Sequence, residues 1–311
     1  MSAARILPFD EFAIAEAARL IAEGKPVAVP TETVYGLAAD ATRGDAVAAI
    51  YAAKGRPSFN PLIVHVPDRA TTERLADLPA PARHLADAFW PGPLTLVAPL
   101  KPGAPIATLA TAGLPTVALR VPAHPAMQAL LAAAGVPLAA PSANASGTIS
   151  PTRAAHVAAS VGLAIPLIID AGPTAVGLES TIVAVDQAGL RILRPGPITA
   201  EQLAEVAGLP IATVPSDRIE APGQLLQHYA PSKPIRLNVQ APRHGEWLIG
   251  FGAIAGHASL SPLGDLGEAA ARLFDLLHQA DASTVHAIAV APIPNVGLGV
   301  AINDRLARAA A

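Results

Sequence analysis

The sequence lacks cysteine, and this absence excludes several kinds of chemistry. Without thiols the chain cannot form disulfides, hold zinc or iron–sulfur clusters through thiolates, or use a cysteine nucleophile. It also lacks any run of 18 apolar residues, although 52% of its residues are hydrophobic, so no transmembrane helix is expected. Asp10 and Glu11 interrupt the N-terminal segment before a signal peptide could develop. We therefore expect a cytoplasmic protein.

Charge is also scarce. Charged residues make up 14% of the chain, and the formal net charge is -3. This balance gives no overall positive field for holding a nucleic acid, so any anion-binding site has to be local. Only four of the 21 basic residues are lysines, and one of them, Lys54, stands two positions before Arg56. This pair of cations is therefore a candidate for such a local anion-binding site.

The length of 311 residues and the order of the patterns indicate two domains. Helical and strand patterns alternate through residues 1–209, which is typical of a mixed α/β domain. Residues 210–234 contain several prolines and no lasting periodicity, and we interpret them as an interdomain linker. Residues 235–311 show the strand and helix order of a small α/β domain with a parallel sheet.

Local patterns place the individual elements of the first domain. Asp10 and Gly24 predict the two ends of a first helix, and the Thr199-x-x-Gln202 capping box predicts the start of a last one. Helices are expected over residues 10–23, 45–53, 82–89, 125–134, 152–160 and 199–207. Strands are expected over residues 27–30, 62–66, 94–98, 116–121, 167–170, 180–185 and 190–193, and one more ends near residue 140.

Several common motifs are missing. The only Gly-Lys pair, Gly24-Lys25, is followed by proline, so there is no P-loop, and neither HExxH nor GxSxG occurs. Gly297-Leu-Gly299 stands where a helix is expected to start, but Ile302 occupies the third glycine position of a dinucleotide fingerprint. That segment is either a partial nucleotide-binding turn or an ordinary strand-to-helix turn.

The informative segments are polar residues that interrupt apolar ones. PTETVYGL, with Thr33, follows a buried strand, where open α/β sheets bind ligands, although it could also be a polar turn. Lys54 and Arg56 at a helix end can converge on a triphosphate or can complement the helix dipole. APSANASG, from Ala140 on, offers hydroxyl and amide groups to phosphates or forms an Asx or Ser turn. GLESTIV and ILRPG place Ser180 and Arg194 on neighbouring strands.

Taken together and in order, these segments resemble a known family. PTETVYGL, AKGRPSFNPLIVHV, FWPGPLTLV, TVALRVPAHP, APSANASG, GLESTIV and ILRPG are similar to the YrdC-domain family of threonylcarbamoyl-AMP synthases, over residues 7–209. APGQLLQHYAP and the C-terminal GLGVAINDRLARAA resemble its longer, two-domain form. The resemblance implies a YrdC-like twisted mixed sheet with surrounding helices, followed by a small C-terminal Rossmann-like α/β domain.

The resemblance also implies an activity. L-threonine, bicarbonate or CO2, and ATP would become threonylcarbamoyl-AMP and pyrophosphate, and the product would pass to a tRNA threonylcarbamoyl transferase for t6A modification. A nucleotidyl transfer of this kind needs preorganised cations around the phosphates, which Lys54, Arg56 and Mg²⁺ would supply. Neither a protein nucleophile nor stable tRNA binding is required.

The family's binding residues can be carried over position by position. On this resemblance, L-threonine would contact Thr33, His65, Arg120, Ala140 (through its backbone) and Ser180. ATP would contact Lys54, Arg56, Asn60, Thr116, Ser142, Asn144, Ser150, Arg194 and Tyr229, with Lys54 and Arg56 as the catalytic pair. Each could instead be a satisfied loop or strand-end residue, above all His65, which lies within an apolar strand.

Two departures and one alternative remain. Ala38 replaces a common glycine, and the linker segment QLLQ lacks the basic residues common there, which puts in doubt whether the linker closes over the site with Tyr229. The alternative is a noncatalytic RNA-binding module, in which Lys54, Arg56, Arg120 and Arg194 would form a local basic patch. Turnover of ATP with threonine and bicarbonate in the absence of RNA separates the two.

Overall fold

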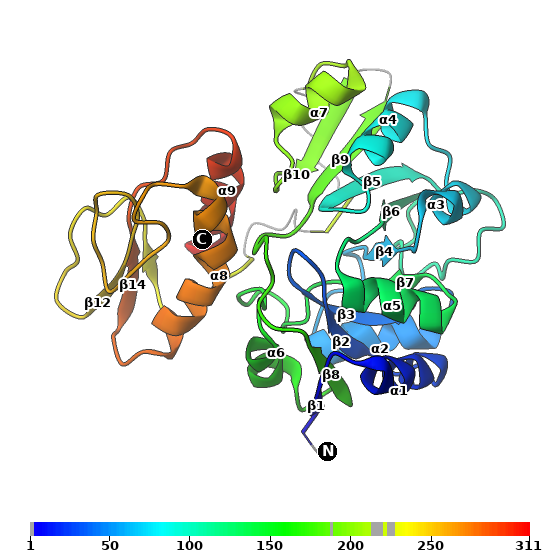
Figure 1. The fold of residues 1–311 in the computed structure, drawn as a ribbon, viewed down its shortest axis with the longest axis horizontal. Coiled ribbons are helices and arrows are strands. Elements are labelled where there is room, and N and C mark those ends of the chain that lie inside the picture. The colour runs from blue at the N-terminus through cyan, green and yellow to red at the C-terminus, as the bar shows by residue number, and fades with distance from the viewer. Residues whose placement is uncertain (1–2, 187–188, 213–219, 223–227) are drawn as a thin grey trace.

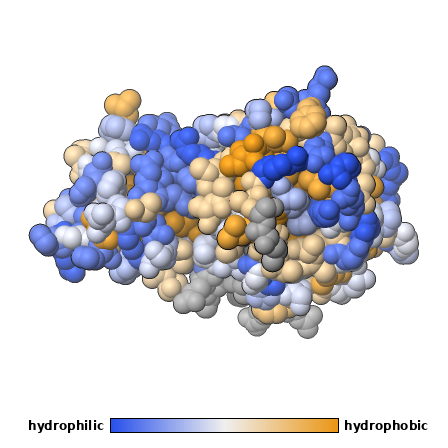
Figure 2. Space-filling view, turned by 90° about the horizontal axis from the view of Figure 1, so that it is seen from below, coloured by the Kyte–Doolittle hydropathy of each residue, from blue (hydrophilic) through white to orange (hydrophobic). Residues whose placement is uncertain are grey.

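The computed structural model describes residues 3–186, 189–212, 220–222 and 228–311 and divides them between two lobes. The larger lobe contains a twisted ten-stranded sheet, and the smaller one contains a four-stranded sheet (Figure 1). Helices α8 and α9 of the smaller lobe face the larger lobe (Figure 1). Figure 2 shows a mainly hydrophilic surface on the smaller lobe and a hydrophobic area, bordered by hydrophilic side chains, on the larger one.

The large sheet is mixed, as predicted. Four neighbouring pairs are parallel, β1·β8, β2·β8, β4·β6 and β5·β9, and the other pairs are antiparallel. Its strands run in the spatial order β1 (Arg5–Pro8), β8 (Leu167–Asp170), β2 (Val27–Pro30), β3 (Tyr35–Asp40), β7 (Leu138–Ala139), β4 (Ile63–His65), β6 (Thr116–Arg120), β5 (Leu94–Pro99), β9 (Thr181–Asp186) and β10 (Gly189–Arg194).

Helices cover both faces of this sheet, because residues along each strand point alternately to opposite sides. Ala28 of β2 packs into the core that contains α2, α4 and α6, whereas Val27 and Val29 pack against α1 and α5. The helices are α1 (Glu11–Ala22), α2 (Gly44–Lys54), α3 (Arg69–Leu75), α4 (Ala80–Phe89), α5 (Pro125–Ala134), α6 (Ala154–Val161) and α7 (Ala200–Ala207). Among the described residues, no helix combines the length and apolar character needed to cross a membrane.

The small sheet is entirely parallel, which confirms the prediction for the C-terminal segment. Its strands lie in the order β11 (Ile235–Arg236), β14 (Ala287–Val290), β12 (Glu246–Gly250) and β13 (Ala258–Ser259), and its helices are α8 (Leu266–Ala282) and α9 (Leu298–Ala309). Val34, Ile149 and Leu178 of the larger lobe are buried in the same cluster as the apolar side chains of α8 and α9. The two lobes therefore share a hydrophobic core.

Local signals from the sequence account for many of these elements. Asp10 caps α1 by accepting from the backbone amide of Ala13, and Thr199 and Gln202 form the predicted capping box of α7. The sequence reasoning missed β1, β3, α3 and β13. In particular, β3 pairs antiparallel with β2, so residues 31–34 form the turn of a hairpin. The predicted linker lies partly outside the described residues, namely over residues 213–219 and 223–227.

Candidate active site

A pocket lies in the larger lobe, with an enclosed volume of about 40 Å³ and about 520 Å³ when the open space at its mouth is included. Ile63 and His65 stand two positions apart in β4, so both side chains point to the same face of the sheet and line the pocket. Arg120 stands beside His65 because the two residues are paired in the parallel register of β4 and β6. The remaining lining comes from the β2–β3 turn and the start of β3, from the segment that follows α2, from the segments around β7 and β9, from the end of β10 and from the segment between α7 and β11. It consists of Thr31, Thr33, Val34, Gly36, Arg56, Ala140, Pro141, Ser142, Glu179, Arg194, Pro222 and His228.

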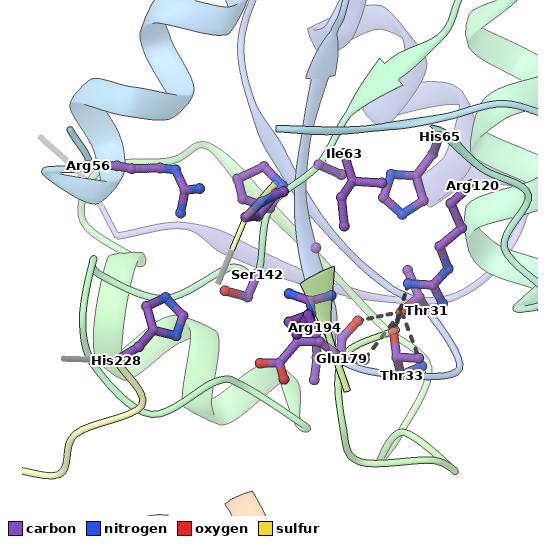
Figure 3. Close-up of a pocket in the computed structure, with 15 residues that line it drawn as sticks. Thr31, Thr33, Arg56, Ile63, His65, Arg120, Ser142, Glu179, Arg194 and His228 are labelled. Carbon is purple, nitrogen blue, oxygen red and sulfur yellow. Dashed lines mark hydrogen bonds between the residues drawn. The ribbon is translucent and has the colours of Figure 1, made fainter. Parts of the chain in front are cut away.

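Figure 3 shows how these side chains are distributed. Thr31, Thr33, His65 and Arg120 gather at one end of the pocket, and Arg56 and His228 lie at the opposite end. Ser142, Glu179 and Arg194 lie between the two groups in this view. The pocket therefore has one end lined by hydroxyl groups, an imidazole and the Arg120 guanidinium, and a second end lined by Arg56 and His228. Polar side chains lie between the two ends.

The first end is built around the Arg120 guanidinium. Arg120 is buried and donates to the Glu32 carboxylate (2.6 Å), the Thr33 hydroxyl (3.0 Å) and the Gly92 carbonyl (3.2 Å). Burial alone would raise the pKa of Glu32, but the charge and hydrogen bond of Arg120 outweigh it and the pKa is lowered. This end presents a cation held in a fixed orientation, the arrangement that recognises carboxylates.

His65 lies at the same end in its neutral form. Burial and the neighbouring positive charge of Arg120 lower its pKa to about 3, so the ring carries no charge in the physiological range. Its Nδ1 atom is buried and has no hydrogen-bond partner in the structure. A neutral imidazole with a free ring nitrogen can accept or donate a hydrogen bond to a bound amino acid.

Two further buried guanidinium groups line the pocket, that of Arg56 at its second end and that of Arg194 in its middle. Arg56 donates to the carbonyls of Asn60 (3.4 Å) and Pro61 (3.1 Å), and Arg194 donates to the carbonyl and hydroxyl oxygens of Ser180 (2.9 and 3.1 Å). Burial lowers the pKa of both, that of Arg56 to about 10, and both remain charged at neutral pH. Within the described part of the chain, neither forms an ion pair with a carboxylate, so their charges can attract an anion.

Lys54 supports the wall of the pocket without lining it. It is 3% exposed, and its ammonium donates to the backbone carbonyl oxygens of Ser142 (2.5 Å) and Asn144. Burial lowers its pKa well below the usual value. These two hydrogen bonds hold the loop that presents the Ser142 side chain to the pocket.

Some buried polar atoms without a partner belong to residues that line this pocket or lie behind its wall, whereas others, such as Trp247 Nε1 and Ser259 Oγ, lie in the smaller lobe. Besides His65 Nδ1, the described residues include the Asn60 and Asn144 side-chain oxygens, His228 Nδ1 and the Tyr229 hydroxyl. Buried polar groups are normally hydrogen-bonded, so a cluster of unpaired ones indicates a place where a ligand supplies partners.

The structure brings half of the predicted binding residues into one pocket. Its lining includes Thr33, Arg56, His65, Arg120, Ala140, Ser142 and Arg194. Ser150 and Ser180 lie behind the wall, where Ser150 donates to Glu179 and Ser180 shares a hydrogen bond with Thr95 (2.7 Å). Lys54, Asn60 and Asn144 also lie behind it.

Neither Thr116 nor Tyr229 lines the pocket. Thr116 begins β6, at the opposite end of the strand from Arg120. Tyr229 is fully buried in the cluster shared with α8 and α9, and its neighbour His228 lines the pocket instead. Contact of Thr116 and Tyr229 with ATP stays a prediction. Residues 224–227, on which the predicted closing of the linker over the site depends, lie outside the described residues.

Sequence reasoning did not single out Glu179 or His228. Glu179 stands next to Ser180 in the GLESTIV segment, and an acidic residue within an apolar stretch is a signal that could have found it. His228 precedes Tyr229 in the linker, and no local pattern distinguishes it. Its position in the pocket arises from contacts between distant parts of the chain.

The fold and the pocket define a class of two-lobed α/β proteins with a ligand pocket lined by buried guanidinium groups. Comparisons with known proteins agree. Residues 19–196 match the Sua5/YciO/YrdC family model, described as telomere recombination, and residues 198–311 match the model of the threonylcarbamoyl-AMP synthase C-terminal domain. The chain belongs to the Sua5/YrdC family.

Individual relatives resemble the chain over nearly its whole length. The threonylcarbamoyl-AMP synthase of Bacillus subtilis is 42% identical, with 96% of this chain and 92% of that protein aligned, and the one from Pyrococcus abyssi is 41% identical (96% and 94%). The crystal structure of P. abyssi Sua5 complexed with L-threonine superimposes with a TM-score of 0.89 at 38% identity, covering 98% of this chain and 97% of that one.

Proposed function

We propose that this protein is an L-threonylcarbamoyladenylate synthase, a nucleotidyltransferase that converts L-threonine, ATP and bicarbonate or CO2 into threonylcarbamoyl-AMP and pyrophosphate. The observation that carries the proposal is the pocket itself, in which a carboxylate-recognising end and a cationic end are joined in one hollow. Relatives named for this activity align with nearly the whole chain, and a similar structure contains L-threonine.

In this proposal L-threonine occupies the end formed by Thr33, His65 and Arg120. The Arg120 guanidinium binds the threonine carboxylate, and the unpaired nitrogen of His65 supplies a polar contact. The backbone of Ala140 and the hydroxyl of Ser180 are assigned to the same substrate, Ser180 through a small rearrangement at the wall. The amine is then directed toward the middle of the pocket.

ATP occupies the opposite end in this proposal. The threonine amine captures CO2 as a carbamate, and a carbamate oxygen attacks the α-phosphate, so that pyrophosphate leaves. Arg56 and Arg194 stabilise the charge that develops on the phosphoryl oxygens, and Lys54 fixes the loop with Ser142. Asn60, Thr116, Asn144, Ser150 and Tyr229 are retained as candidate ATP contacts.

Mg²⁺ is part of the proposal as a companion of ATP. Among the described residues there is no group of three or more side chains suited to hold a metal. Mg²⁺ usually keeps several waters and binds largely through substrate phosphates, so the ion would be held mainly by ATP itself. When bound, the ion neutralises phosphate charge. The activated product suits a transferase that moves the threonylcarbamoyl group to tRNA.

No observation favours the alternative of an RNA-binding module. The four cations that would form its basic patch, Lys54, Arg56, Arg120 and Arg194, are each less than one-tenth exposed and cannot contact a polyanion at the surface. Arg56, Arg120 and Arg194 are accessible to a ligand that enters the pocket, and Lys54 lies behind its wall.

The direct test is an incubation of the purified protein with ATP, L-threonine, bicarbonate and Mg²⁺ in the absence of RNA. Pyrophosphate and a threonylcarbamoyl adenylate, identified by mass, should appear together, and chelation of Mg²⁺ by EDTA should stop both. Omission of threonine or of bicarbonate is the matched control. Pyrophosphate release that ignores both omissions, or tight salt-sensitive RNA binding without turnover, would refute the proposed reaction.

A further inference from the structure

Arg305 of α9 is the side chain through which the smaller lobe reaches the pocket wall. It has no exposed surface, and its guanidinium is directed at the larger lobe. Its Nε donates to the Glu179 carboxylate (2.8 Å) and its Nη2 to the Pro195 carbonyl (2.9 Å), while Nη1 bonds to Asp304 on its own helix (2.6 Å). Two of its three nitrogens therefore serve the other lobe.

The two acceptors on the larger lobe flank a pair of proposed binding residues. Glu179 directly precedes Ser180, and Pro195 directly follows Arg194. Arg194, which lines the pocket, donates to Ser180. A single guanidinium thus ties together both chain segments at the open end of the β9–β10 hairpin, where the pocket cation Arg194 is held.

Arg305 also balances a negative charge inside the pocket. Burial raises the pKa of Glu179, but the charges of Arg305 and Arg194 and the hydrogen bond from Ser150 lower it further than burial raises it, so Glu179 is ionised. Because Glu179 lines the pocket, its carboxylate would repel a triphosphate if nothing neutralised it. The ion pair with Arg305 leaves Arg56 and Arg194 free to act as a net positive end.

We propose that Arg305 is a positioning residue for ATP: it neutralises Glu179 and fixes the Ser180–Arg194 pair, so that the C-terminal lobe sets the affinity of the pocket for the nucleotide. This inference rests on the proposed function. Arg305 touches neither substrate, because the pocket wall separates it from both. Its effect is transmitted through the buried ion pair with Glu179 and the hydrogen bond to Pro195, and its guanidinium also lies over the Tyr229 ring, 5.2 Å from the ring centroid.

The matched control is a second ion pair between the same two lobes. Arg153 beside α6 binds Asp275 of α8 (2.6 Å), and neither residue lines the pocket. Full-length wild type, Arg305→Ala, Arg305→Lys, Arg305→Ala/Glu179→Gln and Arg153→Ala would be compared. The readouts are KM for ATP, KM for threonine, kcat from pyrophosphate release, and calorimetric binding of a non-hydrolysable ATP analogue without threonine.

Arg305→Ala should raise KM for ATP and weaken analogue binding about tenfold or more, equivalent to about 1.4 kcal/mol, with a smaller change in KM for threonine. The added Glu179→Gln should restore most of the lost affinity, because a neutral amide leaves no unpaired charge beside the triphosphate. Arg153→Ala should match wild type in both KM values. Arg305→Lys should lie between wild type and Arg305→Ala, since lysine keeps the charge but cannot bind Glu179 and Pro195 as a fork.

The inference is overturned if Glu179→Gln restores nothing, or if Arg153→Ala weakens ATP binding as much as Arg305→Ala does, because Arg305 would then only hold the lobes together. If Arg305→Ala does not fold, the test uses Arg305→Lys and the double variant Arg305→Lys/Glu179→Gln instead. The inference is then overturned if both folded variants bind the ATP analogue as tightly as the wild type does. Analogue binding still tests Arg305 if the wild type makes no adenylate, so failure of the proposed function is recognised separately.

Discussion

Replacing Arg120 with lysine tests the threonine-binding end of the pocket. The guanidinium has five N–H donors and uses three nitrogens on Glu32, Thr33 and Gly92, which leaves donors for a carboxylate. Lysine keeps the positive charge opposite Glu32 but loses the planar fork. It is a better probe than alanine, because alanine would also remove the ion-pair partner of the partly buried Glu32 carboxylate.

The magnitude follows from the bonds that are lost. A hydrogen bond to a charged group contributes about 1.5–3 kcal/mol, so losing one of those made to the threonine carboxylate should raise KM for threonine about 10- to 100-fold. The carboxylate takes no part in bond making, so Arg120 binds it similarly in the ground and transition states, and kcat should change much less. KM for ATP should stay close to that of the wild type.

Initial rates of pyrophosphate release, with threonine varied at fixed ATP and then the reverse, separate these effects. Arg83→Lys, at an exposed position of α4, is the matched control and should leave both constants unaltered. An equal increase in both KM values for Arg120→Lys, or a loss confined to kcat, would refute the assignment of Arg120 as a carboxylate clamp.

Two further predictions concern groups buried around the pocket. Lys54→Met should reduce adenylate formation about 100-fold, because the loop with Ser142 loses the cation that holds its carbonyls; full activity in a folded variant, checked by the melting temperature, would contradict this. Burial lowers the pKa of His65 to about 3, so between pH 6.5 and 3 the unfolded chain binds a proton that the folded chain does not. The free energy of unfolding, measured in urea at pH 7 and pH 5, should therefore fall on acidification by about 2 kcal/mol on account of His65, and His65→Gln should remove that part of the slope.

The sequence predicted the elements whose signals are local. The strand over residues 27–30 and the helix over residues 125–134 have the predicted bounds, because a continuous apolar run and a Pro–Gly boundary define them. The edge strand β1 depends on pairing with β8, far along the chain, and β3 contains glycine and alanine, which have little intrinsic preference for strands. A short stretch of sequence therefore does not reveal either strand.

The same distinction applies to the pocket. Thr33, Arg56 and Ser142 line it and stand in recognisable motifs, so the family resemblance located them. Glu179 gains its significance only from Arg305, 126 positions later, and such a contact is formed by tertiary structure alone. Sequence motifs therefore locate the substrate contacts better than the groups that adjust their charge.

The apolar residues shared by the two lobes constrain how this chain could be redesigned. Val34, Ile149 and Leu178 are covered by α8 and α9, and a side chain at Gly177 would collide with the backbone of α8, since a Cβ atom there would lie 2.4 Å from the Ala270 carbonyl oxygen. A shortened chain that ends before β11 would expose this hydrophobic surface to solvent, next to the pocket that Val34 lines. A minimal, single-lobe enzyme derived from this protein would thus need polar replacements at those three positions to remain in solution.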